Sequence, residues 1–231
     1  MKTAVITGAN KGIGFAIAKA LGKQDWHVII GARSQERVEA AVEKLHRSGV
    51  EQVDYLLVDL SDPTTIKKTI KTVESDFSKV DLLINNAGIP GGHDSSLTES
   101  IDDLQATMQV NFFGTFQLTQ GLLPILAENN GRIVNITIPT GPNPFWNPFA
   151  YKSTKAAQNV MMQALAIDFE KEKKNLEIFS IHPGPTTTDL NGNMTAEGFH
   201  TPDDVAKKIT DIILDGNSHQ GEFLEIYGEL K

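Results

Sequence analysis

Two side chains four residues apart carry the clearest chemical signal in this sequence. Tyr151 and Lys155 fall in a stretch with a helical pattern, residues 151–169, that is rich in alanine and methionine. Residues four apart lie on one face of a helix, so we expect the ammonium of Lys155 close to the phenol of Tyr151. A free phenol has a pKa of about 10, and a neighbouring cation that favours the phenolate lowers it. The pair is therefore a candidate for general acid/base chemistry.

A glycine-rich turn near the start of the chain predicts a phosphate-binding site. An apolar run from Ala4 to Ile6 breaks into Thr7-Gly8-Ala9-Asn10-Lys11-Gly12-Ile13-Gly14, and a helical pattern follows from Phe15 to Leu21. The glycines leave room for the turn, for a diphosphate against the backbone and for packing of helix on strand. Unpaired N–H groups at the start of that helix favour an anion. The alternative is a tight strand-to-helix turn without a ligand.

Composition excludes several classes of protein. With 231 residues, 40% of them hydrophobic, the chain is long enough for one large α/β domain. A net charge of -8 argues against nucleic-acid and membrane partners. The chain has no cysteine and its six histidines lack a metal-ligand spacing, so we expect no metal. The N-terminus enters the first predicted strand directly and no uncharged apolar run of 18 residues is present, which predicts a cytoplasmic protein.

Strand and helix patterns alternate along the rest of the chain. Short apolar runs predict strands at 27–31, 53–58, 80–84, 132–137, 176–181 and 223–227. Amphipathic patterns and start signals predict helices at 34–48, 62–77, 98–127, 151–169 and 201–214.

This alternation predicts an α/β fold in which a doubly wound parallel sheet of about seven strands has helices on both faces, as in Rossmann-like proteins. We expect one domain over residues 1–231, with the ligand crevice at the carboxyl ends of the strands. Irregular stretches at 88–97, 139–148 and 183–199 leave those ends and are expected to build the site.

The motifs together resemble the short-chain dehydrogenase/reductase family, classical type, over almost the whole chain. They are the glycine turn, Asp59 after the third strand, Asn85-Asn86-Ala87-Gly88 after the fourth, Asn111 in the long helix, Tyr151-x-x-x-Lys155, and Pro183-Gly184 with Thr188 after the sixth. The ending from Gly221 to Lys231 looks most like the small carbonyl-reductase-like members.

The resemblance implies roles for individual residues. Tyr151 would exchange a proton with the carbonyl or alcohol oxygen, Lys155 would also hold the nicotinamide ribose, and Asn111 would hold a water in the proton relay. The cofactor site would consist of Thr7, Gly8, Asn10, Lys11, Gly12, Ile13, Gly14, Arg33, Asp59, Leu60, Asn86, Ala87, Gly88, Tyr151, Lys155, Pro183, Gly184 and Thr188.

The end of the second strand indicates which cofactor binds. Relatives that prefer NAD place an acidic residue there, but this chain has Ala32 followed by Arg33. Arg33 and Lys11 could pair with a 2'-phosphate, which favours NADP (NADPH). The alternative is that both are solvated surface charges.

One position departs from the family pattern. Family members carry a serine thirteen residues before the tyrosine, which donates a hydrogen bond to the reacting oxygen, and this chain has Ile138 there. Losing one such donor costs about 10²- to 10³-fold in rate. Thr140 and Asn143 are the candidate replacements in the substrate pocket.

Two functions remain open from the sequence. The first is an NADP-dependent carbonyl reductase or alcohol dehydrogenase acting on a small carbonyl or alcohol substrate. The second is a catalytically impaired NADP-binding regulator or sensor, which Ile138 favours. A loop with Pro139, Pro142, Phe145, Trp146, Pro148 and Phe149 indicates an apolar substrate pocket or an oligomer contact. The helices at 98–127 and 150–170 are the pair that relatives use to form homo-oligomers.

Overall fold

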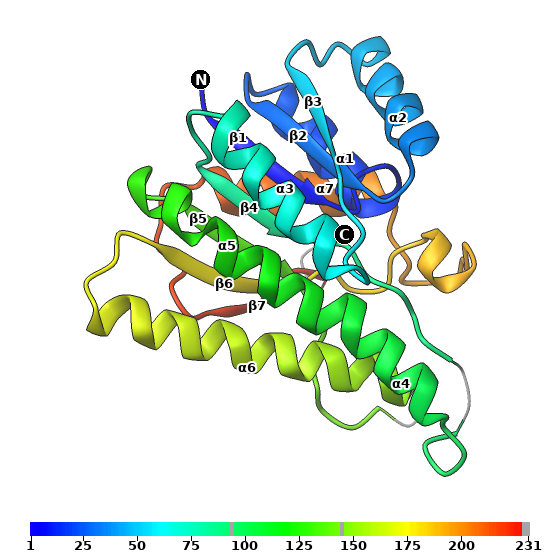
Figure 1. The fold of residues 1–231 in the computed structure, drawn as a ribbon. Coiled ribbons are helices and arrows are strands. Elements are labelled where there is room, and N and C mark those ends of the chain that lie inside the picture. The colour runs from blue at the N-terminus through cyan, green and yellow to red at the C-terminus, as the bar shows by residue number, and fades with distance from the viewer. Residues whose placement is uncertain (93–94, 144–145, 228–231) are drawn as a thin grey trace.

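A parallel sheet of seven strands forms the centre of the molecule (Figure 1). The computed structural model describes residues 1–92, 95–143 and 146–227. The strands are β1 Thr3–Thr7, β2 His27–Ala32, β3 Val53–Leu57, β4 Leu82–Asn85, β5 Arg132–Ile136, β6 Glu177–His182 and β7 Phe223–Glu225. Their order in the sheet is β3-β2-β1-β4-β5-β6-β7. The doubly wound α/β fold expected from the sequence is confirmed.

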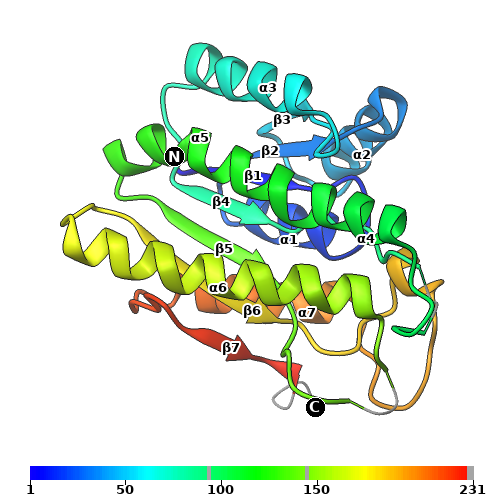
Figure 2. The ribbon, with the colours of Figure 1, turned by 60° about the horizontal axis from the view of Figure 1, so that its bottom comes forward.

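Helices cover both faces of this sheet. They are α1 Gly12–Gly22, α2 Gln35–Arg47, α3 Pro63–Asp76, α4 Ile101–Met108, α5 Thr115–Glu128, α6 Phe149–Lys171 and α7 Pro202–Leu214. Figures 1 and 2 show α1 and α7 together on one face and α3, α5 and α6 on the other. Each face has its own apolar core. Since both faces are buried, the central strands are continuous apolar runs, which is why the sequence pattern located them.

The order of the strands reverses between β1 and β4. From β1 the chain moves outward through β2 and β3, and from β4 it moves the other way through β5, β6 and β7. Ile6 of β1 aligns with Ile84 of β4, and Ile84 with Val134 of β5. Loops that leave these strands at their carboxyl ends therefore diverge at one point, which is where doubly wound sheets bind ligands.

The long helix predicted at 98–127 is interrupted. Ser100 accepts a hydrogen bond from the main-chain N–H of Asp103 (3.1 Å), and α4 begins after this cap. A π-helical turn, Gln109–Gly114, separates α4 from α5. A Cβ on Gly114 would lie 2.1 Å from the carbonyl oxygen of Leu60, so the main chain after β3 passes directly against this turn. The prediction of one regular helix was wrong because this contact is not visible in a periodic pattern.

Smaller differences lie at the ends of other elements. The helix α6 begins two residues before the predicted start and ends two residues after the predicted end. β5 ends at Ile136, so Thr137 and Ile138 belong to the following loop, and β7 ends at Glu225.

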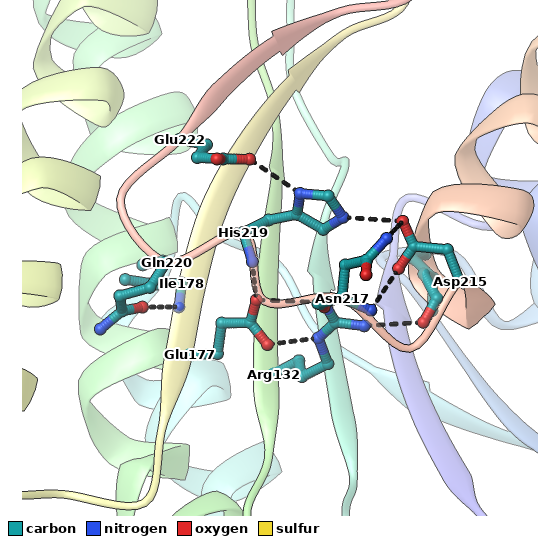
Figure 3. A network of polar contacts seen from close by, with 9 residues as sticks. Arg132, Glu177, Ile178, Asp215, Asn217, His219, Gln220 and Glu222 are labelled. Atoms are coloured by element: carbon teal, nitrogen blue, oxygen red, sulfur yellow. Dashed lines mark hydrogen bonds and ion pairs between the residues drawn. The ribbon is translucent and has the colours of Figure 1, made fainter.

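A polar network fastens the opposite end of the sheet, away from the diverging loops (Figure 3). Arg132 of β5 donates to both carboxylate oxygens of Glu177 on β6, at 2.6 and 3.0 Å. The main-chain N–H of His219 also donates to Glu177. The His219 ring lies between Glu222, at 2.7 Å, and Asp215, at 3.0 Å. This network holds the segment between α7 and β7 against β5 and β6.

The charge of His219 depends on these carboxylates. Burial opposes its charged form, but hydrogen bonds with Glu222 and Asp215 outweigh burial and raise the pKa of His219. A raised pKa stabilises the folded state fully below the unfolded value of about 6.5, and this stabilisation is lost as pH rises through the folded pKa.

We therefore expect His219→Gln to lower the free energy of unfolding more at pH 5.5 than at pH 9. Urea denaturation of both proteins at the two pH values measures the difference. His46→Gln is the matched control, because His46 contacts a main-chain oxygen (Val50) rather than a carboxylate. An equal loss of stability at both pH values for His219→Gln would contradict the assignment.

Candidate active site

The end of β1 lies directly against the end of β4. Gly8 has φ +64°, and a Cβ on it would lie 2.8 Å from Cα of Ala87. The hydroxyl of Thr7 donates to the carbonyl of Ile84 (3.3 Å) and accepts from the main-chain N–H groups of Asn86 (3.1 Å) and Ala87 (3.0 Å). Thr7 and Gly8 therefore join the two strands where the sheet order reverses.

The remaining glycines of the turn, Gly12 and Gly14, lie where neighbouring residues approach the backbone closely. The side-chain amide of Asn86 donates to the carbonyls of Thr7 (2.9 Å) and Gly8 (3.2 Å), and a Cβ on Gly14 would lie 2.4 Å from that amide. Gly12, with φ +60°, begins α1. A Cβ on Gly12 would lie 3.7 Å from Cγ2 of Thr188.

This arrangement fits the diphosphate of a dinucleotide. Asn10 is half-buried in the turn, Lys11 is the exposed residue that precedes the helix, and Ile13 packs its side chain against the core. The start of α1 presents N–H groups with no side chain over Gly12.

Three charged residues expected in the cofactor site, Lys11, Arg33 and Asp59, interact with other polar or charged groups. Arg33, exposed after β2, acts on Asp59, whose pKa is lowered mainly by hydrogen bonds from Ser61 and partly by the Arg33 charge. Lys11 Nζ lies 2.6 Å from a carboxylate oxygen of Asp189. Lys11 therefore forms an ion pair with the loop after β6. Arg33 instead interacts with Asp59, which follows β3.

Asn111 lies in the π-helical turn and is fully buried. Its side-chain oxygen accepts from the N–H of Ile89 (2.8 Å), and its amide donates to the carbonyl of Ile89 (2.9 Å) and to the hydroxyl of Thr154 (3.1 Å). A Cβ on Gly88 would meet the Asn111 oxygen at 3.3 Å. Asn111 thus holds the loop after β4 in place and ties it to α6.

Tyr151 and Lys155 lie side by side on α6, as their spacing predicts. The Nζ atom of Lys155 is 5.5 Å from the centroid of the Tyr151 ring, and the two residues are 2% and 8% exposed respectively. Lys155 Nζ donates to the carbonyl of Ile136 (2.8 Å) and to Oε1 of Gln158 (2.9 Å). The lysine is therefore anchored at the end of β5.

Burial dominates the ionisation of both groups. It raises the pKa of Tyr151 and lowers the pKa of Lys155 from 10.5 to about 7. The lowering of the tyrosine pKa that we expected from a neighbouring cation is not found. Removing both groups from water favours their neutral forms, so proximity on the helix face does not lower the pKa of the tyrosine.

The loop after β5 carries the residues of the expected substrate pocket, and they differ in how far they are exposed to solvent. Ile138 is buried, and its carbonyl accepts from the side chain of Asn159 (3.1 Å). Thr140 and Asn143 are exposed. Trp146 packs edge-on against Tyr151, with ring centroids 6.0 Å apart. Phe145 lies outside the described residues.

The loop after β6 closes one side of the site. Pro183 is buried, and Gly184 has φ +76° with Tyr227 so close that a Cβ would lie 2.1 Å from it. Thr188 caps a short 3₁₀ turn, Asp189–Asn191, in a reciprocal capping box with Asn191. Leu60, on the opposite side, is buried beneath the π-helical turn.

Two residues of this region, Gln158 and Asp189, were not predicted from the sequence. Gln158 lies three residues after Lys155, on the same helix face, and is fully buried; that spacing was a usable signal. Asp189 follows Thr188 directly, but its partner Lys11 is 178 positions away and could not be inferred.

Within residues 1–92, 95–143 and 146–227 no group of three or more His, Asp or Glu side chains is arranged to bind a metal ion. Over the same part of the chain, no helix combines the length and the apolar character that a membrane span requires.

A family model described as short chain dehydrogenase matches residues 2–198. The chain is 31% identical to the short-chain dehydrogenase anuI of Penicillium roqueforti, over 98% of this chain and 92% of that protein.

Solved structures agree with this match. An alcohol dehydrogenase from Thermococcus sibiricus complexed with 5-hydroxy-NADP superposes with a TM-score of 0.85 at 27% identity, covering 97% of this chain and 95% of that one. An actinorhodin polyketide ketoreductase with NADPH has a TM-score of 0.85 at 25% identity, covering 99% of this chain and 97% of that one.

The contact between β1 and β4 makes Gly8 a sensitive position. Gly8→Ala combines a left-handed backbone with a close contact to Ala87, so we expect it to lower stability by at least about 2 kcal/mol. Gly49→Ala is the control, because Gly49 has φ +88° and nothing within 4 Å of its Cβ position. It should cost only about 1 kcal/mol. Thermal denaturation compares the two, and equal losses would show that contact with Ala87 is unimportant.

Proposed function

The chain belongs to the short-chain dehydrogenase family of oxidoreductases, and we propose that it is an NADP-dependent carbonyl reductase or alcohol dehydrogenase with Tyr151 as general acid/base. The observation that carries this proposal is the buried pair of Tyr151 and Lys155 on α6, anchored to the carbonyl of Ile136 at the end of β5. We also propose that residues 1–231 form one domain. We place this oxidoreductase in the cytoplasm, because the absence of cysteine fits a reducing compartment.

The glycine turn would hold the diphosphate of the cofactor, and Asn86 to Gly88 with Pro183, Gly184 and Thr188 would border the rest. When bound, NADPH supplies the hydride that a carbonyl carbon accepts. Gly8 and Gly14, where a Cβ would collide with Ala87 and Asn86, hold the turn against the end of β4, and Gly12 begins α1 without a side chain, which supports this placement.

Tyr151 would supply the proton for the substrate oxygen. Burial raises its pKa, so the phenol stays protonated at neutral pH, which is the form that carbonyl reduction requires. Trp146, packed edge-on against the Tyr151 ring, supports an apolar substrate. Lys155 would add charge beside the phenol below its pKa of about 7.

Two observations support NADP over NAD. Ala32 ends β2 without a carboxylate, and the exposed Arg33 follows it. Relatives of similar fold are described with 5-hydroxy-NADP and with NADPH. Lys11 contributes less than Arg33 to binding of the 2'-phosphate, because its ammonium already donates a hydrogen bond to Asp189.

A second copy of the chain is the protein partner we propose. Phe113 of the π-helical turn, with Val160 and Ile167 of α6, are large apolar side chains at 51%, 63% and 49% exposure. The helix pair that carries them is the one expected from the sequence to form a homo-oligomer.

One observation favours the alternative of an NADP-binding regulator. Ile138 is buried and has no side-chain donor, and Thr140 and Asn143 are both exposed. The regulator would keep the cofactor site and lack turnover.

Turnover of a panel of aldehydes, ketones and quinones with NADPH tests the reductase proposal. Tyr151→Phe should reduce kcat by at least about 10²-fold while the Kd for NADPH stays within about three-fold, because the hydroxyl acts on the substrate oxygen. Tyr55→Phe is the control, since the Tyr55 hydroxyl donates to the exposed carboxylate of Glu39, on the surface of α2. NADPH binding without turnover of any carbonyl would favour the regulator, and a fully active Tyr151→Phe would place the proton donor elsewhere.

Cofactor titration tests the choice of NADP. NADPH should bind at least about ten-fold more tightly than NADH, and Arg33→Ala should remove most of that preference, because a charge-assisted hydrogen bond is worth about 1.5 to 3 kcal/mol. Lys11→Ala should remove less. Arg47→Ala, at a solvent-exposed ion pair with Glu43, is the control and should change neither affinity. Equal affinity for the two cofactors would refute the NADP assignment.

A further inference from the structure

Gln158 is a buried side chain whose amide is engaged at both ends. Its Oε1 accepts from Lys155 Nζ at 2.9 Å, and its Nε2 donates to the main-chain carbonyl of Asn111 at 2.6 Å. Gln158 is 0% exposed and lies one turn after Lys155 on α6. The amide therefore forms a direct bridge from Lys155 to the π-helical turn.

The surroundings of Lys155 make this bridge consequential. The titratable group that faces Lys155 is Tyr151 on the same helix, and the two acceptors of its amine are the main-chain carbonyl of Ile136 and Oε1 of Gln158, both uncharged. A buried ammonium needs hydrogen-bond acceptors to remain charged, and two neutral oxygens provide them without a counter-charge. Among the described residues no charged group offsets the effect of burial, which lowers the pKa of Lys155 to about 7.

The other half of the amide has a separate effect. Gln158 Nε2 donates to the main-chain carbonyl of Asn111, and this hydrogen bond fixes the orientation of the amide so that its oxygen stays turned toward Lys155.

We infer that Gln158 is a positioning residue: it fixes Lys155 at the end of β5 and sets the fraction of Lys155 that is charged. Its effect on Lys155 ionisation is independent of turnover. Its effect on rate rests on the proposed reductase function, in which Lys155 acts beside Tyr151.

Two substitutions of similar length change the bridge in opposite directions. Gln158→Glu places a carboxylate beside the Lys155 amine, which should raise the pKa of Lys155 by at least one unit. Gln158→Met removes the acceptor and should lower it. Gln163→Glu is the matched control, because Gln163 is exposed on the same helix and the substitution adds the same charge.

Titration of the Lys155 side chain by NMR measures this effect without cofactor or substrate. Lysine labelled with 13C at Cε gives the signal, and its loss in Lys155→Met assigns it. The midpoint should lie near 7 in the wild type, move up in Gln158→Glu, move down in Gln158→Met and stay in place in Gln163→Glu. Thermal melts establish that each variant is folded, and either Gln158 variant alone is sufficient.

The pH profile of kcat/KM with NADPH then links ionisation to rate. If the charged form of Lys155 is the active one, activity falls as pH rises through its pKa, and this limb should move upward in Gln158→Glu together with the NMR midpoint. A downward shift of about one unit in Gln158→Met should reduce kcat/KM at pH 7 roughly five-fold.

The outcomes separate the two proposals. A Lys155 midpoint that is unchanged in every folded Gln158 variant overturns the role of Gln158, whatever the activity. A midpoint that moves in a protein with no turnover supports the role in ionisation and rejects the reductase function. A midpoint that moves while the pH profile stays fixed rejects the link to rate.

Discussion

The site depends on how closely the ends of β1 and β4 approach each other. Gly8 leaves no space for a Cβ beside Ala87, and Thr7 joins both strands through one hydroxyl. Asn86 then holds the carbonyl groups of the turn, and α1 starts beyond it. The other parts of the site lie on the loops after β5 and β6, in the π-helical turn and on α6. A packed backbone contact of this kind leaves little room for displacement and therefore places the turn reproducibly.

Much of the fold could be predicted because local pattern and tertiary structure agree. Central strands of a parallel sheet are buried on both faces, so β1, β4 and β6 are apolar runs that the sequence pattern found within a few residues. Tyr151 and Lys155 share a face because helix geometry fixes residues four apart, and α6 is a regular helix.

The parts that could not be predicted depend on partners distant in sequence. The π-helical turn faces the main chain at Leu60, and Lys11 meets Asp189. The ionisation of Tyr151 was expected in the wrong direction because spacing gives proximity but not burial, and burial decides here. The bridge through Gln158 needs the position of the Asn111 carbonyl, which only the packing of α6 on the π-helical turn supplies.

The strand order has a consequence for chain synthesis. β1 lies between β2, which follows it closely, and β4, whose first contact with it joins Thr3 to Asp81 across 78 positions. Closing a loop of that length costs about 4 kcal/mol in entropy. Until β4 has left the ribosome, β1 presents an unpaired apolar edge, which is the kind of edge that recruits strands from other chains. A truncated product that ends before β4 would therefore expose β1, a strand that is paired on both sides in the complete sheet, and be prone to aggregation.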